Sequence, residues 1–398
     1  MSASFKFIHC ADLHLGSSFS GLSSSDAELG KRMKDSLFEA LDAIVSKSKE
    51  EKVDFVIFSG DIFDSSNETP LIRSRFADAL KEIKVPCFIS FGNHDYKRRW
   101  EKSIPFPKNA FVFPENVVKI KFMKNKKAAA IISGASFSTQ HTSEDLTANA
   151  SGSPDVFCIG IFHCNLDASK EDDLYAPCQL SSLLSKDVDY WALGHIHKRE
   201  IVHENPYVVY PGNTQGRNPK ESGEKGAYVV TVNDDVVTEM KFFRTGPILW
   251  QDVTLDIGGT DDIEQALTQL DDVEKGSMIR LTVTGSGSLD SMVRLDPDGF
   301  TELVESRTGS KVTAMEILSK PKIDLDARKD TGDFVSAVIN YGNRLETSSR
   351  EDLLDMICCT NTARSQRNRF ERFSDEELRQ IVRDATYMIV EKMTEAGE

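Results

Sequence analysis

The chain has 398 residues, a formal net charge of −15 at pH 7 and 39% hydrophobic residues. This length fits two or three domains, and the composition is that of an ordinary globular protein, which excludes a disordered or fibrous chain. The acidic balance argues against a protein that holds nucleic acid by bulk electrostatics, because that affinity comes from lysine and arginine side chains that neutralise phosphates.

The cysteine pattern and the hydropathy give further exclusions. The seven cysteines form no CxxC pair of the kind that binds zinc or carries out redox chemistry. The first residues lack a long apolar stretch behind basic residues, and no run in the sequence approaches the length of a membrane span. We therefore expect reduced thiols, no membrane association, and a cytoplasmic location that is nucleoid-associated if the source is bacterial.

In chain order, the first part of the sequence is typical of a layered α/β fold. Up to about residue 245, short apolar runs alternate with stretches of helical period. Apolar residues at three- and four-residue steps from Leu29 to Ile44 predict one helix. A second helix is predicted after Thr69, which suits an N-cap, with Pro70 at the first helical position.

The later part of the sequence has a different character. A strand–helix–strand pattern with glycine and aspartate turns predicts a small α+β cap, and the apolar residues after it fall at helical spacing. We predict three parts: a catalytic domain at 1–245, a capping domain at 246–325 and a C-terminal helical segment at 326–398. The apolar stripe of the last part fits either packing within the protein or a partner-binding surface.

Five apolar, strand-like runs in the first half end in a polar cluster. The clusters are ADLHLG (11–16), SGDIFD (59–64), GNHD (92–95), FHCN (162–165) and GHIH (194–197). In open α/β sheets ligands bind beyond the carboxyl ends of the strands, so side chains directly after five strands can converge on one point. This convergence requires the chain to turn sharply after a strand and backbones to approach each other closely. Glycine permits both, and it stands at positions 60, 92 and 194.

The converging side chains are carboxylates, imidazoles and one amide, a donor set that suits manganese, iron or zinc. They are Asp12, His14, Asp61, Asn93, His163, His195 and His197. These are too many ligands for one catalytic ion that must keep an open position, so they favour two ions that share a carboxylate. Two ions roughly 3.5–4 Å apart can activate a bridging water and clamp phosphoryl oxygens. The sequence therefore predicts phosphoester hydrolysis.

These five motifs, in this order, resemble those of the calcineurin-like metallophosphoesterases. The resemblance implies a four-layered α/β/β/α sandwich and two metal sites. One ion would be held by Asp12, His14, Asp61 and His197. The other would be held by Asp61, Asn93, His163 and His195, with Asp61 as the bridge.

The same resemblance implies roles for two residues outside the ligand set. His94 would contact the scissile phosphate and protonate the leaving group, as a general acid does. Asp95 would orient His94. The other histidines, His9, His141 and His203, are expected to be structural or solvated.

Three further segments resemble the YhaO-type branch of the SbcD-like DNA repair exonucleases: DLYAPCQL (173–180), DYWALGHIHK (189–198) and YPGNTQGRNPKESGEKG (210–226). The match covers roughly the first 245 residues. It implies manganese-dependent cleavage of DNA from an end, with endonuclease cleavage as an additional activity and with iron, zinc or magnesium as alternative metals. It also implies a homodimer and C-terminal helices that bind the coiled coil of an SMC-like ATPase. Asp64 stands where some relatives carry a histidine.

Basic residues near the predicted site are candidates for DNA contacts. Arg98 and Arg99 follow the GNHD motif, with a solvated charged face as the alternative, and Arg217 follows the Pro-Gly-Asn turn at 211–213, with a structural salt bridge as the alternative. The lysines between 119 and 127 fit a hairpin turn better than a DNA contact. Two other functions remain open: a phosphatase or nucleotide phosphodiesterase on the same fold, and a catalytically silent scaffold for the ATPase.

Overall fold

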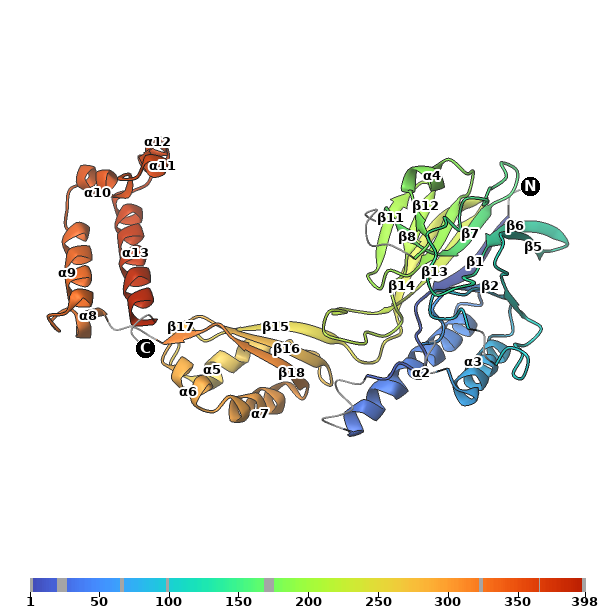
Figure 1. Cartoon of the computed structure of the whole chain (residues 1–398), viewed down its shortest axis with the longest axis horizontal. Coiled ribbons are helices and arrows are strands. Elements are labelled where there is room, and N and C mark those ends of the chain that lie inside the picture. Colours follow the sequence, from blue (N-terminus) through green and yellow to red (C-terminus); the bar gives the residue numbers. More distant parts are fainter. Residues whose placement is uncertain are drawn as a thin grey trace. The chain divides into compact units, whose positions relative to one another are not determined.

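The structure is a computed structural model, and it describes residues 3–19, 27–64, 68–97, 100–167, 175–321, 325–364 and 366–395. The chain divides into two compact units (Figure 1). The first unit comprises Met1–Leu255, Leu267–Thr282 and Thr301–Glu316, and the second comprises Asp256–Ala266, Val283–Phe300 and Ile317–Glu398. The domain boundaries that the sequence suggests at 245 and 325 stay predictions.

The first unit contains a six-stranded sheet in the order β14-β13-β1-β2-β3-β4. Its parallel strands are β1 (Phe5–Cys10), β2 (Phe55–Ser59), β3 (Cys87–Ser90) and β4 (Ala110–Val112). The antiparallel strands β13 (Gly226–Asn233) and β14 (Val236–Arg244) complete it beside β1. The helices that connect the parallel strands, α2 (Ala27–Glu50) and α3 (Pro70–Ile83), pack on one face of this sheet.

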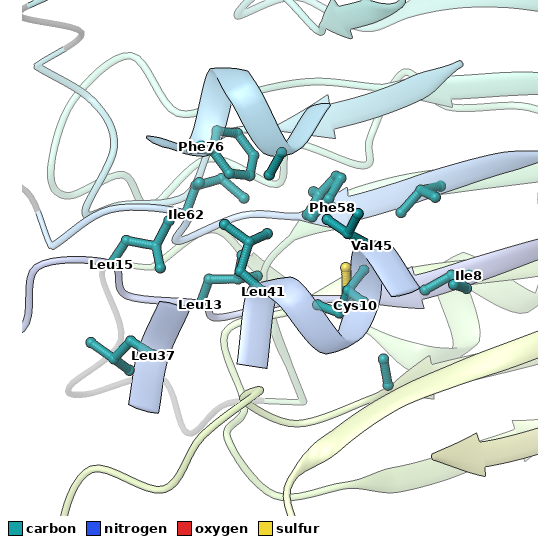
Figure 2. Packing of buried hydrophobic residues seen from close by; sticks show 14 of the residues in the cluster. Ile8, Cys10, Leu13, Leu15, Leu37, Leu41, Val45, Phe58, Ile62 and Phe76 are labelled. Carbon is teal, nitrogen blue, oxygen red and sulfur yellow. The ribbon is translucent and has the colours of Figure 1, made fainter. Parts of the chain in front are cut away.

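Both predicted helices form, and their packing follows from the apolar spacing. Figure 2 shows Leu37 and Leu41 of α2, Phe76 of α3 and Phe58 of β2 within one buried cluster, in which the Phe58 and Phe76 rings lie 5.4 Å apart, centroid to centroid. The start of α3 is the one the sequence predicts, because the Thr69 side chain accepts a hydrogen bond from the backbone N–H of Ile72 and proline stands in the first turn.

A second six-stranded sheet has the order β11-β12-β10-β7-β6-β5. Its strands are β5 (Val118–Lys124), β6 (Lys127–Gly134), β7 (Cys158–His163), β10 (Tyr190–Gly194), β11 (Glu200–Glu204) and β12 (Tyr207–Tyr210). The short helix α4 (Leu180–Leu184) and the two-stranded pair β8 (Asn165–Leu166) and β9 (Pro177–Cys178) accompany it. Leu183 of α4 is buried with Trp191 and Leu193 of β10 on the outer side of this sheet.

The inner faces of the two sheets meet in a shared apolar core. Side chains alternate along β1, so that Phe7 joins the core between the sheets while Ile8 packs toward the helices. Phe7 stacks on Phe55 with ring centroids 5.1 Å apart, and Ile161 of β7 lies in the same core. The layers are therefore helix, sheet, sheet and helix, which confirms the predicted α/β/β/α sandwich.

The elements after β14 agree with the predicted α+β and helical patterns. β15 (Trp250–Asp256), β16 (Met278–Thr284) and β18 (Lys311–Ile317) form a three-stranded sheet. The helical elements here are α5 (Ile263–Leu267), the 3-10 helix η1 (Thr268–Leu270), α6 (Leu289–Leu295) and α7 (Pro297–Thr308). The short strands β17 (Ser286–Gly287) and β19 (Lys320–Pro321) pair with each other.

The C-terminal elements are helical. They are α8 (Leu325–Arg328), α9 (Phe334–Glu346), α10 (Arg350–Ile357), α11 (Asn361–Arg364), α12 (Arg367–Phe370) and α13 (Asp375–Glu395). Leu353 and Leu354 of α10 are buried against Leu378 and Val382 of α13. Among the described residues, no helix is both long and apolar enough to cross a membrane.

Candidate metal centre

The carboxyl ends of strands from both sheets meet at one place, and all seven predicted ligands lie there. They are Asp12 and His14 after β1, Asp61 after β2, Asn93 after β3, His163 at the end of β7, and His195 and His197 after β10. Parallel neighbours end at the same edge of a sheet, which is why residues far apart in sequence converge. Most of these side chains are almost fully buried.

The backbone at the strand exits adopts left-handed conformations that only a strongly supported structure retains. Asp12, His14, Asp61 and His195 have φ values of 53°, 45°, 49° and 102°. Such conformations cost about 1–3 kcal/mol each for residues other than glycine, and they cluster at functional sites. Hydrogen bonds join the loop after β1 to the loop after β2. The Asp12 N–H donates to the Gly60 carbonyl, and the His14 N–H donates to the Asp61 carbonyl.

Glycine is required at the strand exits because the neighbouring groups leave no room for a Cβ atom. A Cβ on Gly60 would lie 2.3 Å from Nδ1 of His163, and Gly60 also has a φ of +90°. A Cβ on Gly194 would lie 1.8 Å from the carbonyl oxygen of Ser59. The two sheets can therefore approach closely enough for their strand ends to share one cluster.

The first group of candidate ligands is Asp12, His14 and His197. Nε2 of His14 lies 3.1 Å from Nε2 of His197, and Nε2 of His197 lies 3.9 Å from Oδ1 of Asp12. Two imidazole nitrogens that face each other at this distance, beside a carboxylate, are an arrangement that a shared cation stabilises. These residues fit a divalent ion.

The second group of candidate ligands surrounds His163. Its Nε2 lies 3.3 Å from Oδ2 of Asp61 and 3.0 Å from Oδ1 of Asn93. The same Oδ2 of Asp61 lies 3.6 Å from Nε2 of His14, so this carboxylate stands between the two groups. His195 completes the second group with its ring 5.2 Å from the His163 ring, centroid to centroid.

The buried side chains perturb one another's protonation. Burial raises the pKa of Asp12 and lowers the pKa of His195 to about 3. Burial also opposes protonation of His163, but the Asp61 carboxylate outweighs burial and raises its pKa to about 9. Asp61 and His163 thus each favour the charged form of the other. An imidazole must be neutral to bind a metal ion, so occupation of this group displaces a proton.

His94 stands beside the cluster with a partly exposed ring. Its backbone N–H donates to Oδ1 of Asp61, and its Nδ1 lies 3.4 Å from Oδ1 of Asp64. The contact with Asp64 raises the pKa of His94. The ring lies 5.0 Å from the His14 ring, centroid to centroid, and 36% of the side chain is exposed. It can therefore reach a substrate bound at the cluster.

Asp64, not Asp95, is the carboxylate that contacts the His94 ring. The buried Asp95 side chain instead accepts hydrogen bonds from the backbone N–H groups of Gly92, Ile62 and Phe63, at 3.0, 3.0 and 2.8 Å. Asp95 thus joins the loops after β2 and β3, and its charge adds to the contact with Asp64 in raising the pKa of His94. Burial raises the pKa of Asp95 to about 7.

A carboxylate that the sequence analysis did not single out lies behind His197. Oε1 of Glu221 is 2.8 Å from Nδ1 of His197, and Lys225 Nζ donates to the carbonyl of His197. Burial raises the pKa of Glu221, but the contact with His197 outweighs burial and lowers that pKa to about 2. In the sequence, Glu221 stands out only as a residue of the 210–226 segment. The sequence of this segment does not show after which strand the Glu221 side chain lies.

Of the residues predicted to contact DNA, only Arg217 lies in the part of the chain that the structure describes; Arg98 and Arg99 lie outside it. The guanidinium of Arg217 contacts Ser17 Oγ at 3.3 Å and Glu221 Oε1 at 3.5 Å. It therefore lies beside the His197 side of the cluster. The lysines at 119–127 belong to the antiparallel β5–β6 hairpin, as the hairpin interpretation predicts.

The other three histidines each have a neighbour outside the cluster of candidate ligands. His9 is buried, with Nδ1 3.0 Å from the hydroxyl of Tyr190, and burial lowers its pKa to about 3. Nδ1 of His203 lies 2.7 Å from the carbonyl of Pro206. The ring of His141 packs against Tyr175.

Two sequence comparisons with known proteins show the family of this chain. The family model described as calcineurin-like phosphoesterase matches residues 5–199. A Bacillus subtilis (strain 168) protein called "uncharacterized metallophosphoesterase YhaO" is 30% identical over 402 residues, which cover 98% of each chain. The chain belongs to the calcineurin-like phosphoesterase family.

Members of this metallophosphoesterase family are hydrolases that use divalent metals, and the His/Asp groups described above could hold such ions. The crystal structure of TT1561 of Thermus thermophilus is also similar, with a TM-score of 0.37 and 11% identity over 61% of this chain and 99% of that chain. The family membership rests on the sequence relatives.

Proposed function

We propose that this metallophosphoesterase is a DNA exonuclease that acts in DNA repair or recombination. It works with two divalent ions, and manganese is the metal that we propose. The observation that carries the hydrolytic part is the position of Asp61, whose Oδ2 lies within 3.6 Å of imidazole nitrogens from both ligand groups. A carboxylate in this position can bridge two ions. Bound ions supply an activated water and neutralise charge on the phosphoryl oxygens.

In this proposal the protein side chains divide the work. Asp12, His14, Asp61 and His197 would hold one ion, and Asp61, Asn93, His163 and His195 would hold the other. His94 donates a proton to the leaving oxygen, as its contact with Asp64 favours the protonated ring. Arg217 adds positive charge on the His197 side, where a DNA phosphate is attracted to it.

DNA as the substrate is supported by the three segments that resemble SbcD-like exonucleases. The net charge of −15 opposes bulk attraction to DNA, so binding has to come from local contacts at the ions and from partners. We propose a homodimer and an SMC-like ATPase as those partners, in the cytoplasm or at the nucleoid. The exposed Phe334, Tyr341, Met388 and Ile389 of α9 and α13 offer an apolar surface for the coiled coil.

The acidic composition favours one competing function, hydrolysis of a small phosphoester by the same site. The test is to incubate metal-stripped protein with end-labelled duplex DNA and, separately, with bis-para-nitrophenyl phosphate, and to add manganese, magnesium or zinc. We expect the DNA to be shortened when manganese is present. Asp61→Ala should abolish this shortening, and the control variant Asp78→Ala, at an exposed residue, should retain it.

Each of the other outcomes would change the assignment. Cleavage of the small ester with intact DNA would favour a phosphatase or nucleotide phosphodiesterase. Inactivity on both substrates with every metal would favour a catalytically silent scaffold.

A further inference from the structure

We infer that Glu221 is the positioning residue of His197, and that it decides how tightly the ion on the Asp12–His14–His197 side is held. This inference rests on the proposed two-metal function. Glu221 does not face the cluster itself. Its Oε1 lies 2.8 Å from Nδ1 of His197, whereas Nε2 on the other side of the ring faces His14 and Asp12.

The contact selects one tautomer of His197. A carboxylate only accepts hydrogen bonds, so Nδ1 has to donate, and in the neutral ring Nε2 then presents its lone pair to the cluster. Nη2 of Arg217 also lies near Nδ1, at 3.3 Å, and a guanidinium only donates. The shorter distance and the negative charge of Glu221 favour donation to the carboxylate over acceptance from Arg217.

Glu221 is itself held in place by the turn that carries it. Its Oε2 accepts hydrogen bonds from Asn213 Nδ2 at 2.6 Å and from the backbone N–H of Arg217 at 2.8 Å. Asn218 Nδ2 donates to Oε1 at 3.1 Å. Only 11% of the Glu221 side chain is exposed. A carboxylate with both oxygens engaged cannot follow a moving ring, so it fixes the orientation of His197.

The charge and shape of Glu221 predict what a glutamine would do there. The amide has one oxygen, so it can accept from His197 or from Asn213 and Arg217, but not from all of them. If the amide oxygen faces Asn213, the NH₂ group faces Nδ1 and drives the proton of His197 to Nε2, where it blocks metal binding. Either arrangement lowers the affinity of the Asp12–His14–His197 side for its ion. Such changes lower metal affinity about 10–100-fold.

The experiment is to titrate manganese into metal-stripped wild type, Glu221→Gln and Glu224→Gln by calorimetry, without DNA. Glu224 is an exposed residue of the same loop and serves as the matched control. We expect two ions to bind to wild type and to Glu224→Gln, and one of them to bind at least tenfold more weakly to Glu221→Gln. Turnover of Glu221→Gln should recover at high manganese, since the variant loses affinity for the ion rather than a reacting group.

Equal manganese affinities in wild type and Glu221→Gln would overturn the inference and leave the proposed function intact. A wild type that binds manganese and leaves DNA intact would overturn the DNA nuclease alone, because the affinity comparison involves no DNA. If Glu221→Gln does not fold, Glu221→Asp replaces it. That variant keeps the charge and withdraws the oxygen from His197, so it should weaken the same ion, and unchanged affinity would refute the positioning role.

Discussion

Oδ2 of Asp61 lies 3.3 Å from Nε2 of His163, although the two residues end strands of different sheets. Asp61→Asn keeps the size of the side chain and removes the charge that two ions would share. Losing several kcal/mol of electrostatic stabilisation corresponds to a rate loss of about 10³-fold. Initial rates on bis-para-nitrophenyl phosphate measure this loss. Asp78→Asn should retain full activity, and residual activity of Asp61→Asn above a tenth of wild type would contradict the bridging role.

The contact between His94 and Asp64 makes a prediction about pH. Because Asp64 stabilises the protonated ring, it raises the pKa of His94, and a general acid is active only below its pKa. Asp64→Asn should therefore move the alkaline limb of the rate profile to lower pH. His94→Ala should lower the turnover number about 10²–10⁴-fold at neutral pH. If the alkaline limb of the Asp64→Asn rate profile stays at the wild-type pH, a group other than His94 sets that limb.

Gly60→Ala should damage the site without unfolding the sheets. The new Cβ would lie 2.3 Å from Nδ1 of His163 and would push that ring away from Asp61 and Asn93. We expect manganese affinity to fall about tenfold or more. Gly276→Ala is the control, because Gly276 also has a positive φ, +80°, but nothing lies near its Cβ position. Equal manganese affinity in Gly60→Ala and Gly276→Ala would show that the clash with His163 does not affect metal binding.

The stacked pair Phe7–Phe55 predicts a large effect on stability. Phe55 is fully buried between the sheets, and Phe→Ala in such a core costs about 3–5 kcal/mol of the free energy of unfolding. Phe111, which is 39% exposed, is the control and should lose much less as Phe111→Ala. Urea unfolding followed by tryptophan fluorescence compares the two variants. Equal losses would show that the core between the sheets does not dominate stability.

Removing and restoring metal should change thermal stability as well as activity. Manganese at about 100 times its dissociation constant stabilises the folded protein by about 2.7 kcal/mol. We therefore expect the melting temperature of chelator-treated protein to rise on addition of manganese, and this rise to shrink in His14→Ala, which removes a buried candidate ligand. His203→Ala, outside the cluster, should retain the full rise. A rise of wild-type size in His14→Ala would contradict its assignment as a ligand.

The sequence predicted the parts of this protein that depend on local pattern. Apolar spacing predicted α2 and α3, the Thr69-Pro70 pair predicted where α3 begins, and strand-like runs ending in polar clusters predicted the seven residues that converge. These predictions succeed because strand direction and sheet edge follow from the order of elements along the chain.

The partners of the site residues could not be derived in this way. The choice of Asp64 over Asp95 beside His94 depends on how the loops after β2 and β3 fold over each other, and the sequence places both carboxylates equally near. Glu221 reaches His197 only because the 210–226 turn folds back over the exit of β10. Local sequence therefore indicated the seven candidate ligands, while the tertiary structure decided that Asp64 and Glu221 join them and which atoms meet there, because loop docking is set by packing between distant segments.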